Sequence, residues 1–107
     1  MSDFSSKVLK IVKKIPRGKV MTYKDIANAM GKPQAARVVG NALNKNPHPI
    51  IIPCHRVVKS NGCVGGYVFG TNEKVKLLEK EGILFRGNKI LNFEEKRICF
   101  VKQHIAW

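Results

Sequence analysis

Apolar residues recur at every third or fourth position near the start of the chain. This period predicts an amphipathic helix over residues 4–15, ending at Pro16-Arg17-Gly18. Thr22 is a typical N-cap for a second helix over residues 23–30. A third helix is expected from about Ala35 to Asn44, after a glycine-containing turn. Two short helices joined by such a turn form the outline of a helix-turn-helix.

The second half of the chain carries shorter elements. The apolar run Ile50-Ile51-Ile52 predicts a short buried strand or extended segment, and the glycine-rich residues 60–70 predict a loop that forms a pocket wall. A fourth helix is expected from residue 71 or 72 to Gly82, and a small hairpin around residues 86–89. The pattern does not decide between helix and strand for residues 94–107.

The chain has 107 residues, 44% of them hydrophobic, which is enough for one modest core and therefore one domain, residues 1–107. We predict an α/β fold that is mostly helical, with a winged-helix-like helix-turn-helix, a short strand beside the candidate site and a small hairpin. Three cysteines without paired spacing fit neither a disulfide framework nor a zinc site, so we expect a reduced, intracellular chain without bound metal. The sequence has no signal-peptide pattern and no apolar stretch of about 18 residues, which predicts a soluble, unexported protein.

The net charge is +13, and it is unevenly distributed. Residues 1–60 carry 12 basic and 2 acidic side chains, whereas residues 61–107 carry 8 and 5. A positive field of this strength favours a polyanionic partner. An anionic membrane is one alternative, but no interfacial helix anchored by aromatic residues is evident, so nucleic acid is the preferred interpretation.

Cys54 and His55 stand side by side in the sequence Pro53-Cys54-His55-Arg56-Val57, and this pair is the strongest candidate for chemistry. The thiolate is the nucleophilic form of cysteine, and proton-accepting or cationic neighbours favour it. The alternative is a small buried cysteine beside a surface histidine. Pro53 fixes the backbone before the thiol, and the preceding apolar run would hold the pair on a rigid element, so we favour a nucleophile.

Glu81 is a second candidate, because it stands at the C-terminal end of the fourth predicted helix. A carboxylate at that end opposes the helix dipole. Its position therefore indicates a partner elsewhere in the fold.

Five short motifs occur in order along the chain. They are Thr22-Tyr23-Lys24-Asp25-Ile26-Ala27, Pro33-Gln34-Ala35-Ala36-Arg37-Val38-Val39-Gly40, Asn46-Pro47-His48-Pro49-Ile50-Ile51-Ile52-Pro53-Cys54-His55-Arg56-Val57-Val58, Gly65-Gly66-Tyr67 and Leu77-Leu78-Glu79-Lys80-Glu81-Gly82. In this order and spacing they resemble the C-terminal, active-site domain of the O6-alkylguanine-DNA alkyltransferases, or methylated-DNA–protein-cysteine methyltransferases. The resemblance covers residues 4 to about 83 and leaves residues 84–107 as a C-terminal extension.

The resemblance implies a DNA repair reaction without cofactor or metal. Cys54 would accept an alkyl group from O6-alkylguanine, and from O4-alkylthymine, in double-stranded DNA, in one irreversible turnover. His55 would deprotonate the thiol through a bound water, and Glu81 would orient the histidine. Asn46 would brace the turn that holds the active site.

The resemblance also implies residues that bind the DNA. Arg37 would fill the gap left by an extruded nucleotide, and the small residues Ala35 and Ala36 would let the third helix enter the minor groove. Tyr23 would approach the rotated phosphate and the N3 atom of guanine.

Other residues would form the pocket for the extruded base. The carbonyl groups of Cys54 and Val58 would read the exocyclic amine. Tyr67 would be the pocket tyrosine, and Val68, where many relatives have serine, would offer a backbone N–H. Phe69 would narrow the pocket and disfavour large O6 substituents.

We expect a monomer in the cytoplasm, or in the nucleus of a eukaryote. Many relatives carry an N-terminal domain before this one, and the initiating Met1 favours a minimal natural protein. One alternative is a non-enzymatic damage sensor of the alkyltransferase-like kind, which recruits other repair factors, but those proteins replace the acceptor cysteine. Another alternative, a helix-turn-helix transcription regulator, would leave the motif around Cys54 and the glycine-rich loop unexplained.

Overall fold

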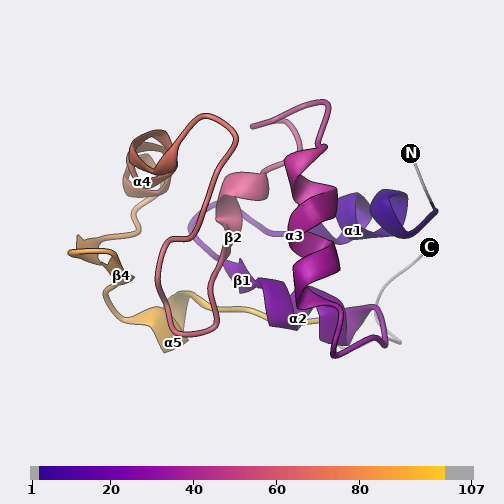
Figure 1. Cartoon of the computed structure of the whole chain (residues 1–107). Helices are drawn as coiled ribbons and strands as arrows, with labels where there is room; N and C mark the ends of the chain where they lie inside the picture. The colour runs from indigo at the N-terminus through magenta and orange to yellow at the C-terminus, as the bar shows by residue number, and fades with distance from the viewer. Residues whose placement is uncertain (1–2, 101–107) are drawn as a thin grey trace.

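The computed structural model describes residues 3–100 of the chain, and Figure 1 shows how its elements are arranged. Three helices lie in one half of the molecule, and the fourth helix and a hairpin lie in the other. In chain order the elements are α1 (Asp3–Lys13), β1 (Met21–Thr22), α2 (Tyr23–Ala29), α3 (Ala36–Asn44), a 3-10 turn (Cys54–Arg56), β2 (Val57–Val58), α4 (Thr71–Lys80), β3 (Phe85–Arg86), β4 (Lys89–Ile90) and α5 (Phe93–Lys96).

The first three helices lie where the sequence pattern predicts them, and the predicted helix-turn-helix is confirmed as α2 and α3. α1 packs against α3, and α3 packs against α2. The face of α1 that is turned to the core carries Val8, Leu9, Ile11 and Val12, all buried. Burial of this apolar stripe is the main stabilising contribution of α1, because a helix of 11 residues is marginal by itself.

A capping box fixes the start of α2. The Thr22 hydroxyl accepts a hydrogen bond from the Asp25 backbone N–H at 2.9 Å, and Asp25 Oδ2 accepts one from the Thr22 backbone N–H at 3.1 Å. Both residues are buried. The first residue of α2, Tyr23, therefore follows a rigid backbone segment.

Two small sheets complete the architecture. β1 pairs in parallel with β2, with Met21 opposite Val57 and Thr22 opposite Val58. β3 and β4 form the predicted antiparallel hairpin. The parallel pair joins the start of the helix-turn-helix to the residues that directly follow the 3-10 turn of Cys54–Arg56.

The predicted buried strand over residues 50–52 is wrong. Ile50 and Ile51 are 55% and 75% exposed, and the short strand beside the candidate site lies after Cys54, as β2. The apolar run is flanked by prolines, which cannot donate to a strand ladder, so the chain closes a local turn in which Ile52 N donates to His48 O at 2.9 Å. In that turn the φ angle of Ile50 is 78°, a region that β-branched residues rarely adopt.

The buried apolar residues form two clusters. The larger lies among the first three helices and includes Met21, Cys54 and Val57 from the neighbouring strand and turn. The smaller joins α4, the hairpin and the strands, and its buried members are Val20, Val58, Val64, Leu78, Ile83 and Ile90. Because β2 contributes Val57 to the larger cluster and Val58 to the smaller one, the candidate site is supported from two sides.

The sequence left the structure of residues 94–107 open. Its first part forms α5, and Arg97 then makes a parallel bridge with Val20. Residues 101–107 lie outside the described part of the chain.

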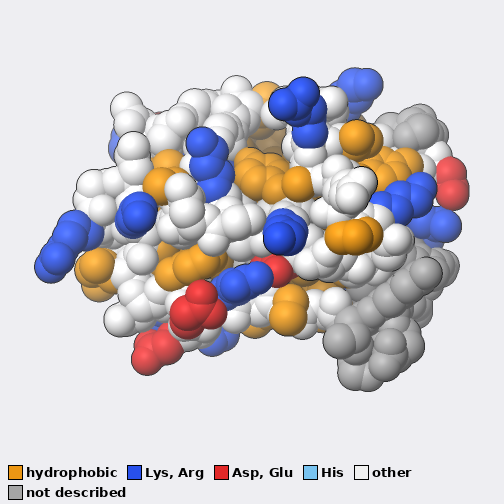
Figure 2. Space-filling model, turned by 60° about the horizontal axis from the view of Figure 1, so that its bottom comes forward, with side chains coloured by type: hydrophobic (Ala, Val, Ile, Leu, Met, Phe, Trp, Pro, Cys, Tyr) orange, Lys and Arg blue, Asp and Glu red, His pale blue; other side chains and the backbone are white. Residues whose placement is uncertain are grey.

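The side of the molecule at the bottom of Figure 1 is turned forward in Figure 2. Lys and Arg side chains are spread across that face, and Asp and Glu side chains are fewer. Across residues 3–100, no helix has the length and apolar character needed to cross a membrane. The same residues contain no group of His, Cys, Asp and Glu side chains that could hold a metal ion.

Candidate active site

Cys54 begins the 3-10 turn that runs into β2. The residue is 7% exposed and lines a small pocket with a volume of 20 Å³. The candidate nucleophile thus lies where the helix-turn-helix meets the glycine-rich loop. The other residues that line the pocket are Tyr23 of α2, Gly40, Leu43 and Asn44 of α3, and Gly66, Tyr67 and Val68 of the loop.

His55 and Glu81 lie in contact although 26 residues separate them in the sequence. His55 Nε2 is 3.0 Å from Glu81 Oε2, and the two side chains are 1% and 7% exposed. The other ring nitrogen, His55 Nδ1, is buried and has no hydrogen-bond partner among residues 3–100. When Nε2 donates to the carboxylate, Nδ1 is the acceptor, so it can take a proton from a water or a thiol in the site.

Arg56 completes this network and was not among the sequence-predicted site residues. Its Nε donates to Glu81 Oε1 at 2.9 Å, and its Nη2 donates to Glu81 Oε2 at 2.8 Å. Arg56 Nη1 donates to the Ile15 carbonyl at 2.8 Å. The bidentate pair holds the carboxylate in one orientation, and it supplies the partner that a charge at the end of α4 requires.

The protonation states of the pair follow from burial and neighbouring charges. Burial lowers the pKa of His55, and the charges of Arg56 and Lys74 lower it further, although Glu81 acts in the opposite direction. Burial alone would raise the pKa of Glu81, but the hydrogen bonds from Arg56 and His55 outweigh burial and lower it. At neutral pH His55 is therefore a neutral proton acceptor beside an ionised carboxylate, which stabilises the imidazolium formed on proton transfer.

Lys74 is a second residue that sequence reasoning missed. It is fully buried on α4, and its Nζ donates to the carbonyl of Val57 at 2.6 Å and to that of Gly66 at 3.0 Å. Burial lowers its pKa to about 7, against the effect of the negative charge of Cys54. Lys74 thus ties α4 to β2 and to the pocket loop. Its position one helical turn before the buried Leu78 is the signal that could have identified it.

Asn46 lies behind the turn that leads to Cys54. Its Nδ2 donates to the Ile52 carbonyl at 3.0 Å, and its Oδ1 accepts from the His48 backbone N–H at 2.9 Å. The side chain is 9% exposed. These two bonds span the loop between α3 and the 3-10 turn, so Asn46 holds the backbone that precedes the cysteine.

The two tyrosines of the pocket keep their phenolic protons at neutral pH. Burial and the negative charge of Cys54 raise the pKa of Tyr23. Burial, with smaller effects of Cys54 and Glu73, raises the pKa of Tyr67 to about 12. The Tyr67 hydroxyl is buried and has no partner among residues 3–100, so it is a hydrogen-bond donor left for a ligand.

Phe69 is not among the residues that line the pocket, contrary to the expectation from sequence. Its side chain is 56% exposed, and its ring meets that of Tyr67 edge-on at 5.6 Å. Gly65, in the same loop, has a φ of +75°, and a Cβ atom added there would lie 3.3 Å from the Tyr23 hydroxyl. Glycine is therefore required where the loop passes Tyr23.

The DNA-binding residues expected on α3 lie apart from the pocket. Ala35 and Ala36 are at the N-terminal end of the helix, and Arg37 follows them with its side chain exposed. The residues of α3 that line the pocket are instead Gly40, Leu43 and Asn44, whose spacing of three and four puts them on one helical face. Sequence reasoning did not select these three.

The remaining expected pocket residues differ in placement. Val68 lines the pocket and is 53% exposed. Val58 is fully buried in β2 and is not among the lining side chains, so its carbonyl group is the part that could meet a base.

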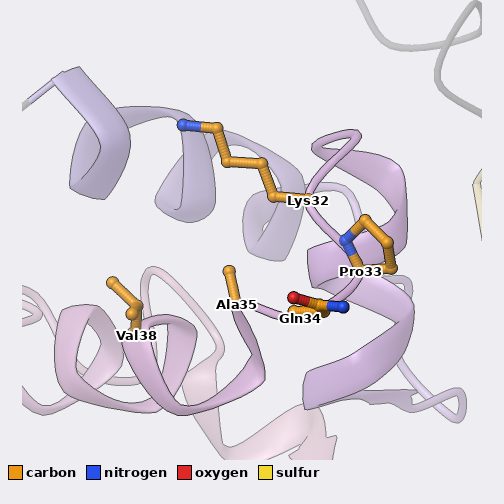
Figure 3. A pocket seen from close by; sticks show the side chains of 5 residues that line it. All are labelled: Lys32, Pro33, Gln34, Ala35 and Val38. Carbon is orange, nitrogen blue, oxygen red and sulfur yellow. The ribbon is translucent and has the colours of Figure 1, made fainter.

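A larger hollow of about 390 Å³ lies beside the turn between α2 and α3. Figure 3 shows Ala35 and Val38 on α3 below it, and the Lys32 side chain extended above them toward α1. The Lys32 Nζ lies 5.3 Å from the centre of the Phe4 ring. The hollow holds none of the candidate catalytic residues, so the chemistry is assigned to the smaller pocket at Cys54.

Comparison with known proteins gives consistent matches. The sequence model of the family described as 6-O-methylguanine DNA methyltransferase, DNA binding domain, matches residues 3–83. A methylated-DNA–protein-cysteine methyltransferase of Methanothermobacter thermautotrophicus is 44% identical over 87 residues, which is 80% of this chain and 48% of that protein. A protein of the same name from Saccharolobus solfataricus is 55% identical over 80 residues, which is 75% of this chain and 51% of that protein.

Two solved structures show the same fold. The Mycobacterium tuberculosis OGT in complex with DNA is 46% identical, with a TM-score of 0.74, over 76% of this chain and 50% of that one. The S. pombe Atl1, in complex with damaged DNA containing O6-carboxymethylguanine, is 34% identical, with a TM-score of 0.75, over 92% of this chain and 96% of that one. The chain thus spans about half the length of the curated methyltransferases and nearly the whole length of Atl1.

Proposed function

Because the chain belongs to the 6-O-methylguanine DNA methyltransferase family, through that family's DNA-binding domain, we propose that it repairs O6-alkylguanine in DNA by transferring the alkyl group to Cys54. The observation that carries this proposal is the arrangement around Cys54. A buried cysteine lines a pocket, and the histidine that follows it is neutral, with one nitrogen held by an ionised glutamate and the other without a partner among the described residues. This is the arrangement of a nucleophile with an oriented general base.

The reaction balances without a further reactant. The Cys54 thiol gives its proton to His55 Nδ1 through a water, and the thiolate attacks the alkyl carbon. A sulfur–carbon bond forms while the carbon–O6 bond breaks, and the electron pair of the broken bond stays on guanine. Guanine takes up one proton in return, so the products are unmodified guanine and a thioether on Cys54. No group among residues 3–100 could reverse a thioether, so each molecule reacts once.

Cys54 cannot reach the alkyl carbon of a base that is stacked in DNA, so the nucleotide must rotate out of the DNA double helix. In this proposal Arg37 takes the space of the extruded base, which is compatible with its exposure near the start of α3. The Tyr67 hydroxyl, which has no partner within residues 3–100, can donate to the base, and Val68 borders the same pocket. O4-alkylthymine offers an equivalent alkyl carbon and is a second substrate of the same chemistry.

In the described structure the pocket is too small to hold a base. Its volume of 20 Å³ is far below the roughly 300–1,000 Å³ of typical small-molecule sites. The half-exposed loop at Val68 forms its outer side, so this loop moves outward when a base enters.

The net charge of +13 supports DNA as the partner, because Lys and Arg neutralise phosphates. A one-to-one reaction on one lesion requires one copy of the chain, so we propose that it acts as a monomer. It acts where DNA is kept, in the cytoplasm of a prokaryote or the nucleus of a eukaryote.

A titration of an O6-methylguanine duplex with increasing protein tests the proposal. Repaired guanine should rise in proportion to added protein and stop at one per molecule. Cys54→Ser should abolish repair, whereas the matched control Cys63→Ser, at a half-buried cysteine outside the pocket, should leave it intact. Repair by Cys54→Ser would contradict the proposal.

The full-length match to Atl1 favours a second candidate function, a sensor that binds alkylated DNA without repairing it. The two functions predict opposite results in the same titration. A sensor would bind the lesion duplex and leave the amount of O6-methylguanine unchanged at every protein concentration.

A further inference from the structure

Residues 84–100 lie outside residues 3–83, which the family model matches, yet this C-terminal segment is built into the fold. Val20 N donates to the Lys96 carbonyl, and Ile98 N donates to the Val20 carbonyl, both at 2.9 Å. These bonds form a parallel bridge between Arg97 and Val20, the residue that directly precedes β1. In Figure 1 the segment after α5 runs along β1 and α2.

Arg97 reaches from this segment to the helix-turn-helix. Its Nε donates to Asp25 Oδ2 at 2.9 Å, and its Nη2 donates to Asp25 Oδ1 at 2.7 Å. The Asp25 side chain is 4% exposed and that of Arg97 is 34% exposed. A bidentate pair with one buried member fixes the carboxylate more strictly than a surface pair would.

Asp25 is also the N3 member of the capping box of α2, so the same carboxylate holds Arg97 and the backbone N–H of the N-cap residue Thr22. Tyr23 directly follows Thr22, and its side chain lines the pocket of Cys54. Arg97 is therefore connected to the pocket residue Tyr23 through the Asp25 side chain and the capped turn.

Further contacts anchor the segment to the rest of the fold. They hold Arg97 in place while its guanidinium binds Asp25. Phe93 packs against Gly62, where an added Cβ would lie 3.3 Å from the Phe93 ring. Lys19 Nζ donates to the Glu95 carbonyl at 2.9 Å. The Arg97 guanidinium lies 6.0 Å from the centre of the Phe93 ring.

We propose that Arg97 is a positioning residue, which clamps Asp25 and the first turn of α2 so that Tyr23 keeps its place in the pocket wall. The consequence for repair rests on the proposed function. The consequence for the placement of Tyr23 does not.

The test uses the full chain labelled with 3-fluorotyrosine. The sequence has two tyrosines, so the fluorine spectrum should contain two resonances, and Tyr67→Phe assigns them. Arg97→Ala is compared with Arg86→Ala, which removes the same charge from an exposed residue of the same segment. We expect Arg97→Ala to shift the Tyr23 resonance and to slow methyl transfer from a lesion duplex by about tenfold, because misplaced pocket groups are costly to rate. Arg86→Ala should do neither.

Three further measurements separate positioning from a loss of stability. Alkylation of Cys54 by iodoacetamide should proceed at the parent rate in Arg97→Ala, because Arg97 does not contact the network of His55 and Glu81. Asp25→Asn keeps an oxygen that can cap Thr22 but removes the charge, so adding Arg97→Ala to it should produce little further change. Arg97→Lys should restore part of the rate, because an ammonium can still donate to the carboxylate.

An unchanged Tyr23 resonance in Arg97→Ala would overturn the proposal, and so would equal slowing of methyl transfer and iodoacetamide alkylation. If Arg97→Ala does not fold, Arg97→Lys replaces it, and a Tyr23 resonance and transfer rate identical to the parent's would overturn the proposal. If the parent protein transfers no methyl group, the proposed function fails, while the Tyr23 resonance still decides the positioning role.

Discussion

Replacing Glu81 by glutamine perturbs the network that prepares His55. The carboxylate accepts hydrogen bonds from His55 Nε2, Arg56 Nε and Arg56 Nη2, at 3.0, 2.9 and 2.8 Å. An amide keeps one oxygen acceptor but turns two N–H donors toward the donors of Arg56. It also leaves the Arg56 charge without a counterion in a site where Glu81 is 7% exposed.

The size of the effect on stability follows from this burial. Removing one member of a buried ion pair costs about 3–5 kcal/mol. Because Arg56 is 16% exposed and keeps its bond to the Ile15 carbonyl, we expect the lower end, about 3 kcal/mol. For a chain of this size that loss lowers the melting temperature by roughly 12 °C or more. Rates must therefore be measured well below the melting temperature of the variant.

The effect on rate has a pH signature. Glu81 raises the pKa of His55 against the effect of burial, so its removal lowers that pKa further. The rate of methyl transfer falls at low pH as His55 becomes protonated, and in Glu81→Gln this fall should move to lower pH. At the plateau, where His55 is neutral in both proteins, loss of orientation should slow transfer by about 10²-fold.

The assay is single-turnover methyl transfer from a lesion duplex across a pH series, with the folded fraction checked at each pH. Glu79→Gln is the matched control, because Glu79 is an exposed glutamate near the end of the same helix. A pH–rate profile of Glu81→Gln that overlays the profiles of the parent and of Glu79→Gln would refute the role of Glu81 as the partner of the base.

Three further predictions concern the nucleophile, the recognition helix and the buried lysine. Cys54→Ala should lose methyl transfer but keep its affinity for the lesion duplex in a filter-binding assay, and methyl transfer through Cys63 would contradict the assignment. Arg37→Ala should slow repair of duplex DNA more than repair of a short single strand, whereas Arg86→Ala, at an exposed arginine, should slow neither, and an equal effect of the two variants would remove the special role of Arg37. The pKa of Lys74 is lowered from 10.5 to about 7, so between these two pH values the unfolded chain binds more protons than the folded chain, and the free energy of unfolding should rise there by roughly 1 kcal/mol per pH unit. Urea unfolding of Lys74→Met should lack this rise, and a parallel rise in both proteins would show that other groups cause it.

Elements with a clear period were predictable from the sequence. α1, α2, α3 and α4 carry apolar residues at helical spacing and end within three residues of a glycine, proline or asparagine, so their existence and approximate bounds follow from local physics. The run Ile50-Ile51-Ile52 misled the prediction because its apolar character was weighed without the flanking prolines, which exclude a paired strand.

The site was predictable in part. Cys54 and His55 are neighbours in the chain, and Glu81 stood out because its charge opposes the dipole of α4. The contact between Arg56 and Glu81 joins residues 25 apart, and the contact between Arg97 and Asp25 joins residues 72 apart. Composition and period carry no information on such pairs. The burial of Lys74 was not predicted because a lysine on a helix is usually exposed, and only the packing of the fold shows that this one is buried.

The central claim is that Cys54 removes the alkyl group from DNA and keeps it. Its most direct test is intact-mass measurement of the protein after incubation with a duplex that carries one O6-methylguanine, followed by peptide mapping. We expect one methyl group per molecule, on Cys54, with no gain after incubation with undamaged DNA. An unchanged mass in protein that binds the lesion duplex, or a methyl group on Cys63 or Cys99 in place of Cys54, would contradict it.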